Sequence, residues 1–468
     1  MKSPFRLFFQ FSLGTWASAV LNVLTLPVIT WLISPEEFGR AAMFLLAYNL
    51  LLVVITLGQD QSYIRFYNEI PEEHRALIFG RTLLPIFFAW LVVVAFVELF
   101  SADVSRLLFE EPKPNLIHLF CITLLLGVLN RFGQLILRMK GKAVLYSVIQ
   151  LLVVATNMAV TIAYATWITK SFDAVIAGFS ASLAAGALGG FILERAEWRS
   201  LFSIPKHAQL PSARKIFVYG LPFTPTFLID WGFQGAERAF LRVYATFSEI
   251  GIYSMASRLS SSLSVVQTGF NAFWSPYVFN RFNQDPEDNA FYKQAFDFIV
   301  AGFSGLILLV LLAKDLLHFI LGQEYAASIN LFILLLLVPF FSTLSEVTSV
   351  GINLSKKTHW HFYIILAVSL VSLANCYLLI PTLGAKGAVV ANVLSNTAFF
   401  AFRTYCGIRL YRINISWFNF ATNLTCLAVP LVLAFLGFTK WWFSACFLFA
   451  VAIANRHVLM YAKKRWMA

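Results

Sequence analysis

The sequence predicts an all-α, polytopic membrane protein of about fourteen transmembrane helices, and three observations support this fold class. The chain of 468 residues is 59% hydrophobic and only 12% charged, which leaves too little polar surface to cover a water-soluble globule. The apolar residues come in runs of about 20, such as 82–100 and 331–351, each long enough to cross a membrane as a helix. Basic residues concentrate in alternate loops between these runs.

The apolar runs place the spans. The loops between them are short throughout, so there is no room for a soluble catalytic domain and we expect a protein that is not an enzyme.

The first run follows Lys2 and Arg6, but it is too long for a signal peptide and no cleavage site follows. The predicted spans are 10–33, 41–58, 82–100, 114–137, 143–168, 174–193, 216–236, 250–272, 295–313, 329–352, 362–380, 387–408, 416–437 and 441–461.

The distribution of charge predicts the orientation. Most of the 35 lysines and arginines fall in segments on one side of the predicted spans. By the positive-inside rule that side is cytoplasmic, and both termini lie there. Topology therefore accounts for the net charge of +12, with contact to membrane lipid headgroups as a consequence, and no nucleic-acid partner is expected.

An internal repeat suggests two lobes. The segment EEFGRAAMFLLAYNLLLVV (36–54) is echoed by SEIGIYSMASRLSSSLSVV (248–266), and the same offset carries spans four to six onto ten to twelve. Six spans per copy give both copies the same orientation, related by a pseudo-twofold axis along the membrane normal. We expect a six-helix lobe at 1–200, a second at 201–412, and two additional helices with a basic tail at 413–468.

Ionisable residues inside spans are the first candidates for function, because each costs at least ~2.5 kcal/mol near the bilayer centre. Arg258 lies on a serine-rich helix face, and its guanidinium would match an anionic phosphate. The alternative is a structural ion pair with Asp230 or Glu346. Those two acids would then balance charge, whereas otherwise they would couple transport to an ion or proton. Arg131 either joins Arg258 in binding or extends to the nearby membrane interface.

Two further groups lie at span ends. Asp60 and Arg65, at the cytoplasmic end of span two, would form a gate or headgroup-contacting pair, or else simply anchor the helix at the interface. Asp60 is also a candidate for ion coupling or for balancing charge. Glu237 and Arg238, at the outer end of span seven, are gate candidates, or solvated caps.

Prolines recur in the corresponding spans one and seven. Pro27 lies in span one, and Pro222 and Pro225 lie in span seven. Because proline removes a helical hydrogen bond, these are hinge candidates, the alternative being a fixed bend.

No motif for a cofactor or a metal is present. The sequence contains no phosphate-binding P-loop and no nucleophile motif, so ATP hydrolysis is not expected. The five cysteines lack CxxC spacing and fall in apolar runs, and the histidines lack companion ligands, so no metal is expected.

Several segments, in this order, resemble the oligosaccharide (O-antigen and exopolysaccharide) flippases of the multidrug/oligosaccharidyl-lipid/polysaccharide exporter superfamily. The resemblance covers roughly residues 10–410. The segments are LISPEEFGRAAMF, GQDQSYIRFY, LRMKGKAVLYSVIQ, YGLPFTPTFLIDW, EIGIYSMASRLSS, GINLSKKTH and LGAKGAVVANVLSN.

The resemblance implies a bacterial inner-membrane protein whose two lobes open alternately to either side around a cationic cavity. Its substrate would be a polyprenyl-pyrophosphate-linked glycan, held at the headgroup by Arg258, Arg131 and Arg65, and a polysaccharide polymerase would be a further partner. No cofactor is implied beyond coupling to a proton or sodium gradient or to the membrane potential. Span one lacks the basic residues that lipid II flippases have there, which weakens a lipid II assignment.

Two other functions remain as alternatives. A cation-coupled multidrug exporter shares the same fold, although the candidate site looks at least as cationic as acidic. A membrane glycan polymerase or ligase would be an enzyme, and the large extracytoplasmic loop typical of that class is missing.

Overall fold

The computed structural model describes residues 4–70, 75–200, 211–285, 289–411, 413–438 and 441–456, and this part of the chain is helical without any strand. It divides into two compact units, Met1–Gly235 (the first unit) and Ala236–Ala468 (the second unit). The boundary falls inside one helix, α11 (Phe223–Tyr244), so the division predicted at 200/201 and 412/413 stays a prediction.

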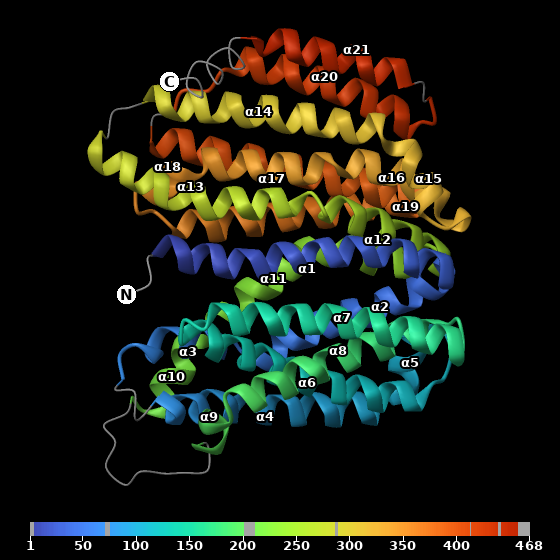
Figure 1. Cartoon of the computed structure of the whole chain (residues 1–468), viewed down its shortest axis with the longest axis vertical. Helices are drawn as coiled ribbons and strands as arrows, with labels where there is room; N and C mark the ends of the chain where they lie inside the picture. Colours follow the sequence, from blue (N-terminus) through green and yellow to red (C-terminus); the bar gives the residue numbers. More distant parts are fainter. Residues whose placement is uncertain are drawn as a thin grey trace. The chain divides into compact units, whose positions relative to one another are not determined.

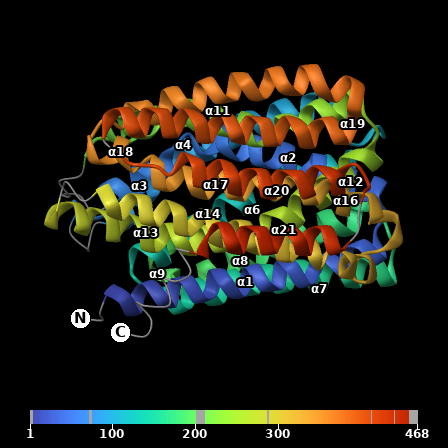
Figure 2. The ribbon, with the colours of Figure 1, turned by 90° about the horizontal axis from the view of Figure 1, so that it is seen from above.

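The helices of the first unit surround α8 and α6. In Figure 1, α7, α8, α6 and α4 lie side by side, and Figure 2 shows α1 beside α7. The helices are α1 (Pro4–Leu32), α2 (Pro35–Thr56), α3 (Gln59–Tyr67), α4 (Arg75–Leu99), α5 (Ser101–Phe109), α6 (Pro114–Met139), α7 (Ala143–Trp167), α8 (Phe172–Leu193), α9 (Arg195–Ser200) and α10 (Ala213–Gly220).

In the second unit, α17 and α16 pack against the long helix α19, and α14 packs against α20 and α21. Two short 3-10 helices, η2 (Lys314–Leu316) and η3 (Gln323–Tyr325), accompany the α-helices. The α-helices are α12 (Phe247–Ser261), α13 (Ser264–Gln284), α14 (Asn289–Leu312), α15 (Leu317–Ile320), α16 (Ala326–Leu335), α17 (Leu337–Thr348), α18 (Val350–Leu354), α19 (His359–Leu410), α20 (Trp417–Phe435) and α21 (Trp441–Ala454).

Within the described residues, nine helical segments are long and apolar enough to cross a membrane, so the chain is a multi-pass membrane protein as predicted. One of them, α19, covers two predicted spans that meet at a kink at Gly384. The predicted first and last spans contain shorter apolar stretches, 16–32 of α1 and 445–454 of α21. Predicted spans seven and eight do not qualify: α12 has only 15 residues, and α11 and α13 carry several polar and charged residues. The count of fourteen stays a prediction.

The internal repeat corresponds to a duplicated capping arrangement. At the start of α2, Ser34 accepts a hydrogen bond from the Glu37 backbone N–H, and at the start of α12 Thr246 and Glu249 form a reciprocal capping box. The Glu37 carboxylate also accepts from the backbone N–H of Phe172 (2.7 Å), and that of Glu249 accepts from Ala385 (3.4 Å). Each glutamate therefore lies at the N-terminus of its own helix and accepts a hydrogen bond from the backbone of a later one, but only Glu249 also caps its own helix with its side chain.

A buried polar ladder attaches the last two helices to α14. Asp297 of α14 accepts hydrogen bonds from Ser416, the N-cap of α20, and from Asn419 (2.9 and 3.0 Å). Asn423 of α20 and Asn455 at the end of α21 exchange amide hydrogen bonds, and both are almost fully buried. Because unpaired polar groups are costly in an apolar medium, this ladder fixes how α20 and α21 pack on α14.

Candidate functional site

A polar pocket of about 360 Å³ opens in the first unit among α2, α3, α6 and α7. Its volume is within the range of roughly 300–1,000 Å³ typical of small-molecule sites. Most of its lining side chains carry hydrogen-bonding groups, which is unusual inside a bundle of apolar helices. The lining residues are Tyr48, Leu52, Asp60, Gln61, Ile64, Gly127, Asn130, Arg131, Gln134, Leu135, Arg138 and Tyr146.

An ion pair lies at the centre of this pocket. Arg131 of α6 donates from Nη2 to Oδ2 of Asp60 in α3, at 2.5 Å. The Asp60 side chain is only 5% exposed, whereas 43% of the Arg131 side chain is exposed. The buried carboxylate therefore orients the guanidinium, whose remaining N–H groups make no further hydrogen bond to the described residues. Oδ1 of Asp60 is also buried without a partner in the described part of the chain.

Local backbone geometry places these side chains. Leu57 and Gly58 both adopt left-handed conformations between α2 and α3, so α3 starts in a new direction and turns Asp60 inward. Gly127 of α6 leaves room for Tyr48, because a Cβ there would lie 2.0 Å from the tyrosine hydroxyl oxygen. The tyrosine thereby packs against α6 and lines the pocket beside Arg131.

The predicted pairing of Asp60 with Arg65 is wrong. Arg65 instead pairs with Glu69, one helical turn further along, at 2.9 Å, and both side chains are largely exposed. The two residues lie five positions apart on a helix, which points them to different faces. Sequence reasoning also left open that Arg131 reaches the interface alone, whereas the structure pairs it with Asp60.

The second unit has its own buried ion pair, which the sequence did not reveal. Arg403 of α19 donates to the Glu346 carboxylate at 2.6 Å and to the Ser345 hydroxyl at 2.9 Å. Arg403 lies near the end of the predicted span 387–408, and its side chain is only 11% exposed. The alternative that Glu346 partners Arg258 is therefore wrong.

The other predicted charges stand without ionic partners among the described residues. Arg258 is half-buried in α12. Asp230 accepts a hydrogen bond from Gln234 at 2.7 Å. Glu237 is 1% exposed and so is no solvated cap, and it makes no ion pair with Arg238. The roles predicted for these four residues stay predictions.

The prolines predicted as hinges in spans one and seven lie in different surroundings. Pro27 lies inside the continuous helix α1. The chain instead breaks at Leu221 and Pro222, between α10 and α11, and Pro225 falls in the first turn of α11. A hinge role for these prolines stays a prediction.

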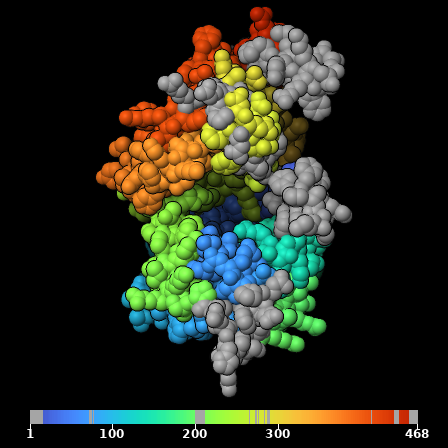
Figure 3. Space-filling view, turned by 90° about the vertical axis from the view of Figure 1, so that its left-hand side faces the viewer, coloured from blue at the N-terminus to red at the C-terminus, as the bar shows by residue number. Residues whose placement is uncertain are grey.

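The segment before the break is fixed to α3. Ser62 donates to the carbonyl of Ile216 (2.8 Å) and Gln59 to that of Phe217 (3.2 Å), and both side chains are fully buried. The backbones approach so closely that a Cβ on Gly58 would lie 2.2 Å from the Gly220 carbonyl oxygen. In Figure 3 the green surface of this segment lies against the blue surface of α3. Helix α10 is thus an integral part of the first unit.

A charged cluster, the clasp, joins the end of α6 to the junction of α8 and α9. Glu194 accepts from Lys140 and Lys142 (2.8 and 2.5 Å), and Lys140 also pairs with Glu197 (3.0 Å). The pKa of Glu194 is lowered, because the opposite effect of burial is outweighed by its hydrogen bonds with the two lysines. The pKa of Lys140 is raised, because the opposite effect of burial is outweighed by its glutamate partners. Sequence reasoning placed these lysines in a loop and missed the clasp.

No group of three histidines, cysteines, aspartates or glutamates that could hold a metal ion occurs in the described ranges. The pocket in the first unit therefore offers hydrogen-bonding and ionic groups: a guanidinium held by a buried carboxylate, a second arginine, two tyrosines and three amides. Such a set can bind an anion together with hydroxyl-rich groups.

Comparison with known proteins identifies the family. Residues 7–282, more than half of the chain, match the family described as polysaccharide biosynthesis protein. The chain belongs to this family. No protein with a curated description matches the sequence.

Solved structures show which fold this polysaccharide biosynthesis protein has. It is similar to a lipid II flippase, MurJ, in an inward closed conformation, with a TM-score of 0.68 at 14% identity over 98% of this chain and 99% of that one. It is also similar to a MATE protein in the bent conformation (TM-score 0.56, 16% identity, 86% of this chain and 94% of that one). An inward-facing multidrug resistance MATE transporter of the MOP superfamily gives the same TM-score at 15% identity, with the same coverage. At these identities the likeness establishes the fold.

Proposed function

We propose that this protein is a flippase that moves polyprenyl-pyrophosphate-linked oligosaccharides from the cytoplasmic to the periplasmic leaflet of a bacterial inner membrane. The products would serve synthesis of a cell-surface polysaccharide such as O-antigen or exopolysaccharide. Membership of the polysaccharide biosynthesis family and the fold shared with flippases support this function. The observation that carries it is Arg131, held by buried Asp60 in a polar pocket within a membrane protein.

The pocket suits the headgroup of such a substrate. Arg131 and Arg138 supply charge for pyrophosphate oxygens, and a guanidinium offers paired donors that match them. Asn130, Gln134 and Tyr146 supply neutral groups of the kind that bind sugar hydroxyls. The pocket lies in the half of the first unit that the charge distribution predicts to be cytoplasmic, where the substrate would be loaded.

The remaining predicted residues have subsidiary roles in this proposal. Arg258 would bind the headgroup, and exposed Arg65 would attract it at the surface. Asp230 and Glu346 would balance charge or couple flipping to a proton or sodium gradient or to the membrane potential. The prenyl tail would remain in the membrane.

A cation-coupled multidrug exporter is the second candidate. Two observations favour it: the similarity to multidrug transporters over 86% of the chain, and the buried Oδ1 of Asp60, which has no partner in the described part of the chain and could accept a proton or a cation. Against it, the exposed member of the ion pair is the arginine, which repels cationic drugs.

The test is flipping in proteoliposomes. Purified protein is reconstituted with a fluorescent polyprenyl-pyrophosphate oligosaccharide, and the label reaching the opposite leaflet is followed by a membrane-impermeant quencher. Arg131→Ala should slow flipping at least about ten-fold, since a charged hydrogen bond contributes roughly 1.5–3 kcal/mol. Arg131→Lys should fall in between.

Arg195→Ala is the matched control, because Arg195 is an exposed arginine of α9 that makes no ion pair with the described residues. Its flipping rate should equal that of the unaltered protein. Undiminished flipping by Arg131→Ala would refute the proposed site. Transport of a cationic dye into the same vesicles, without lipid flipping, would establish the exporter instead.

A further inference from the structure

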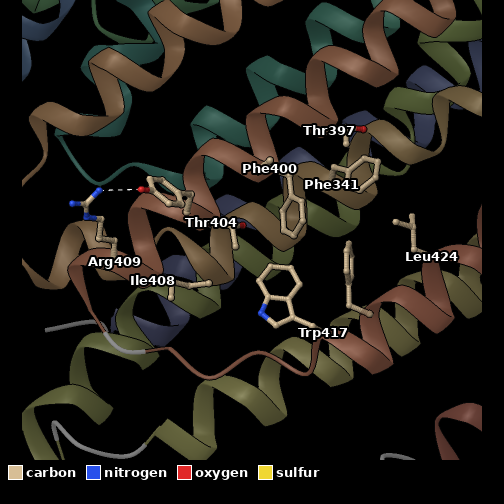
Figure 4. A pocket seen from close by; sticks show the side chains of 11 residues that line it. Phe341, Thr397, Phe400, Thr404, Ile408, Arg409, Trp417 and Leu424 are labelled. Carbon is tan, nitrogen blue, oxygen red and sulfur yellow. Dashed lines mark hydrogen bonds between the residues drawn. The ribbon is translucent and has the colours of Figure 1, made fainter.

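A second pocket, of about 490 Å³, lies within the second unit between α17, the C-terminal half of α19 and the start of α20. Figure 4 shows aromatic and aliphatic side chains pointing into it from all three helices. Its apolar lining includes Phe341, Phe400, Ile408, Trp417, Phe420 and Leu424.

The walls of this pocket are held in place by ring packing. The ring centroid of Phe400 lies 5.7 Å from that of Phe341 and 5.4 Å from that of Phe420, and all three side chains are buried. Trp417 packs on Phe420 at 6.1 Å, with half of its surface exposed. Because α19 and α20 both qualify as membrane spans, the medium around this apolar hollow is hydrocarbon. A lipid chain is therefore the natural occupant.

Arg409 lies at one end of the pocket, away from Thr397 (Figure 4). Its guanidinium donates to the Tyr405 hydroxyl at 2.9 Å, which holds it at that end. The other donors of Arg409 have no hydrogen-bonding or ionic partner among the described residues. Trp417, an amphipathic residue typical of the membrane interface, follows α19 in the chain after a short connection.

We propose that this pocket binds an anionic membrane phospholipid, with one acyl chain among the aromatic rings and the phosphodiester on Arg409. A single arginine matches the single charge of a phosphodiester, whereas a pyrophosphate carries more charge. The charge distribution predicts that Arg409 lies on the cytoplasmic side, where anionic lipids attract basic residues. This site is separate from the headgroup pocket of the first unit and does not depend on what the protein transports.

Fluorescence quenching of Trp417 tests the site directly. The full chain is reconstituted into vesicles that contain phosphatidylglycerol or phosphatidylcholine with brominated acyl chains, which quench only nearby indoles. The chain has 12 tryptophans, so each measurement is paired with Trp417→Phe and the difference isolates Trp417. We expect Trp417 to prefer phosphatidylglycerol over phosphatidylcholine roughly five-fold, the factor that corresponds to about 1 kcal/mol for one basic residue at a membrane surface.

Three variants locate the two parts of the lipid. Arg409→Gln should abolish the preference, and Arg409→Lys should retain most of it. Arg195→Gln, which removes an exposed arginine of the first unit, should leave it unchanged. Ala401→Phe, which places a ring in the pocket, should reduce the quenching of Trp417 by both lipids.

The outcomes decide the proposal. Equal quenching by the two lipids, or a preference that survives Arg409→Gln in correctly folded protein, would overturn the phosphate site. Unchanged quenching in Ala401→Phe would overturn the acyl-chain site. Displacement of phosphatidylglycerol by an equimolar polyprenyl phosphate, but not by an unlabelled phosphatidylglycerol, would show that the pocket serves a prenyl chain instead.

Discussion

The two units each contain a buried ion pair, and the two pairs expose opposite charges. In the first unit the acid is buried: Asp60 is 5% exposed, against 43% for Arg131. In the second unit the base is buried: Arg403 is 11% exposed, against 30% for Glu346. Arg131 of α6 and Glu346 of α17 lie near equivalent positions of the internal repeat, so a duplicated scaffold presents a cation in one unit and an acid in the other.

The difference shows how burial decides what an ion pair can do. The buried partner is fixed by packing and orients the other, and only the exposed partner remains available to a ligand. The first unit is therefore suited to an anion. The second is suited to a proton or a cation, because its accessible member is a carboxylate. In the proposed flippase, the first pair would bind the anionic headgroup and the second would serve coupling to an ion.

The largest effects are expected from the loss of either paired arginine. Arg131→Met leaves Asp60, whose side chain is 5% exposed, without its cation, and we expect it to lower the free energy of unfolding by about 3–5 kcal/mol. Arg403→Met should cost less, because the Glu346 side chain that it leaves is 30% exposed. Thermal unfolding in detergent measures both variants, and Glu346→Leu combined with Arg403→Met should recover most of the loss at that pair. A cost of Arg403→Met equal to or above that of Arg131→Met would contradict the comparison.

A smaller effect is expected at the clasp, which lies at helix ends. Glu194→Gln removes the charge that Lys140 and Lys142 share, and should cost about 1–2 kcal/mol at neutral pH. The folded-state pKa of Glu194 is lowered, so its stabilisation is present above the ordinary glutamate pKa of about 4.3 and is lost as pH falls through the folded value. Because the pKa of Lys140 is raised, its contribution to the free energy of unfolding persists into the alkaline range and is lost as pH rises through the folded value.

The measurement is the unfolding temperature of Glu194→Gln and of the unaltered protein between pH 3 and pH 8. The two should differ at neutral pH and converge at acidic pH. A constant difference across this range would show that the carboxylate charge is not the stabilising feature.

The smallest effect is expected at Arg65. Arg65 and Glu69 form an exposed pair one helical turn apart, and Arg65→Ala should change stability by no more than about 0.5 kcal/mol. Thermal unfolding provides the baseline against which the buried pairs are judged. A cost comparable to that of Arg403→Met would mean that exposure does not rank these pairs.

The sequence predicted the membrane fold well, because apolar runs such as 82–100 and 114–137 report directly on helices that must satisfy their own backbone. It was less informative where a span carries polar residues. Span seven is broken into α10 and α11, since the hydrogen bonds that fix α10 come from side chains more than 150 positions earlier. Hydropathy and residue spacing within a span do not reveal contacts with such distant residues.

The candidate site was predicted only in part. Arg131 and Glu346 stood out because charge inside a span is costly, and Asp60 because it lies at the end of a span. Their partners did not, because pairing depends on which helix faces come together: Asp60 meets Arg131 of α6, and Glu346 meets Arg403 of α19. The echo of Glu37 in Glu249 was visible in the sequence, but its physical reason, a carboxylate that accepts a hydrogen bond from the backbone of a later helix, appears only in the structure.

The attachment of α10 to α3 also bears on how the chain is made. Gln59 and Ser62 leave the ribosome long before the carbonyls of Phe217 and Ile216 with which they will bond. A nascent chain that ends at residue 200 therefore lacks these acceptors. Until they are synthesised, the side chains of Gln59 and Ser62 cannot form these two hydrogen bonds. The first half of the protein completes its packing only once residue 220 has been synthesised, by which time the chain is already committed to the turn that starts the second half.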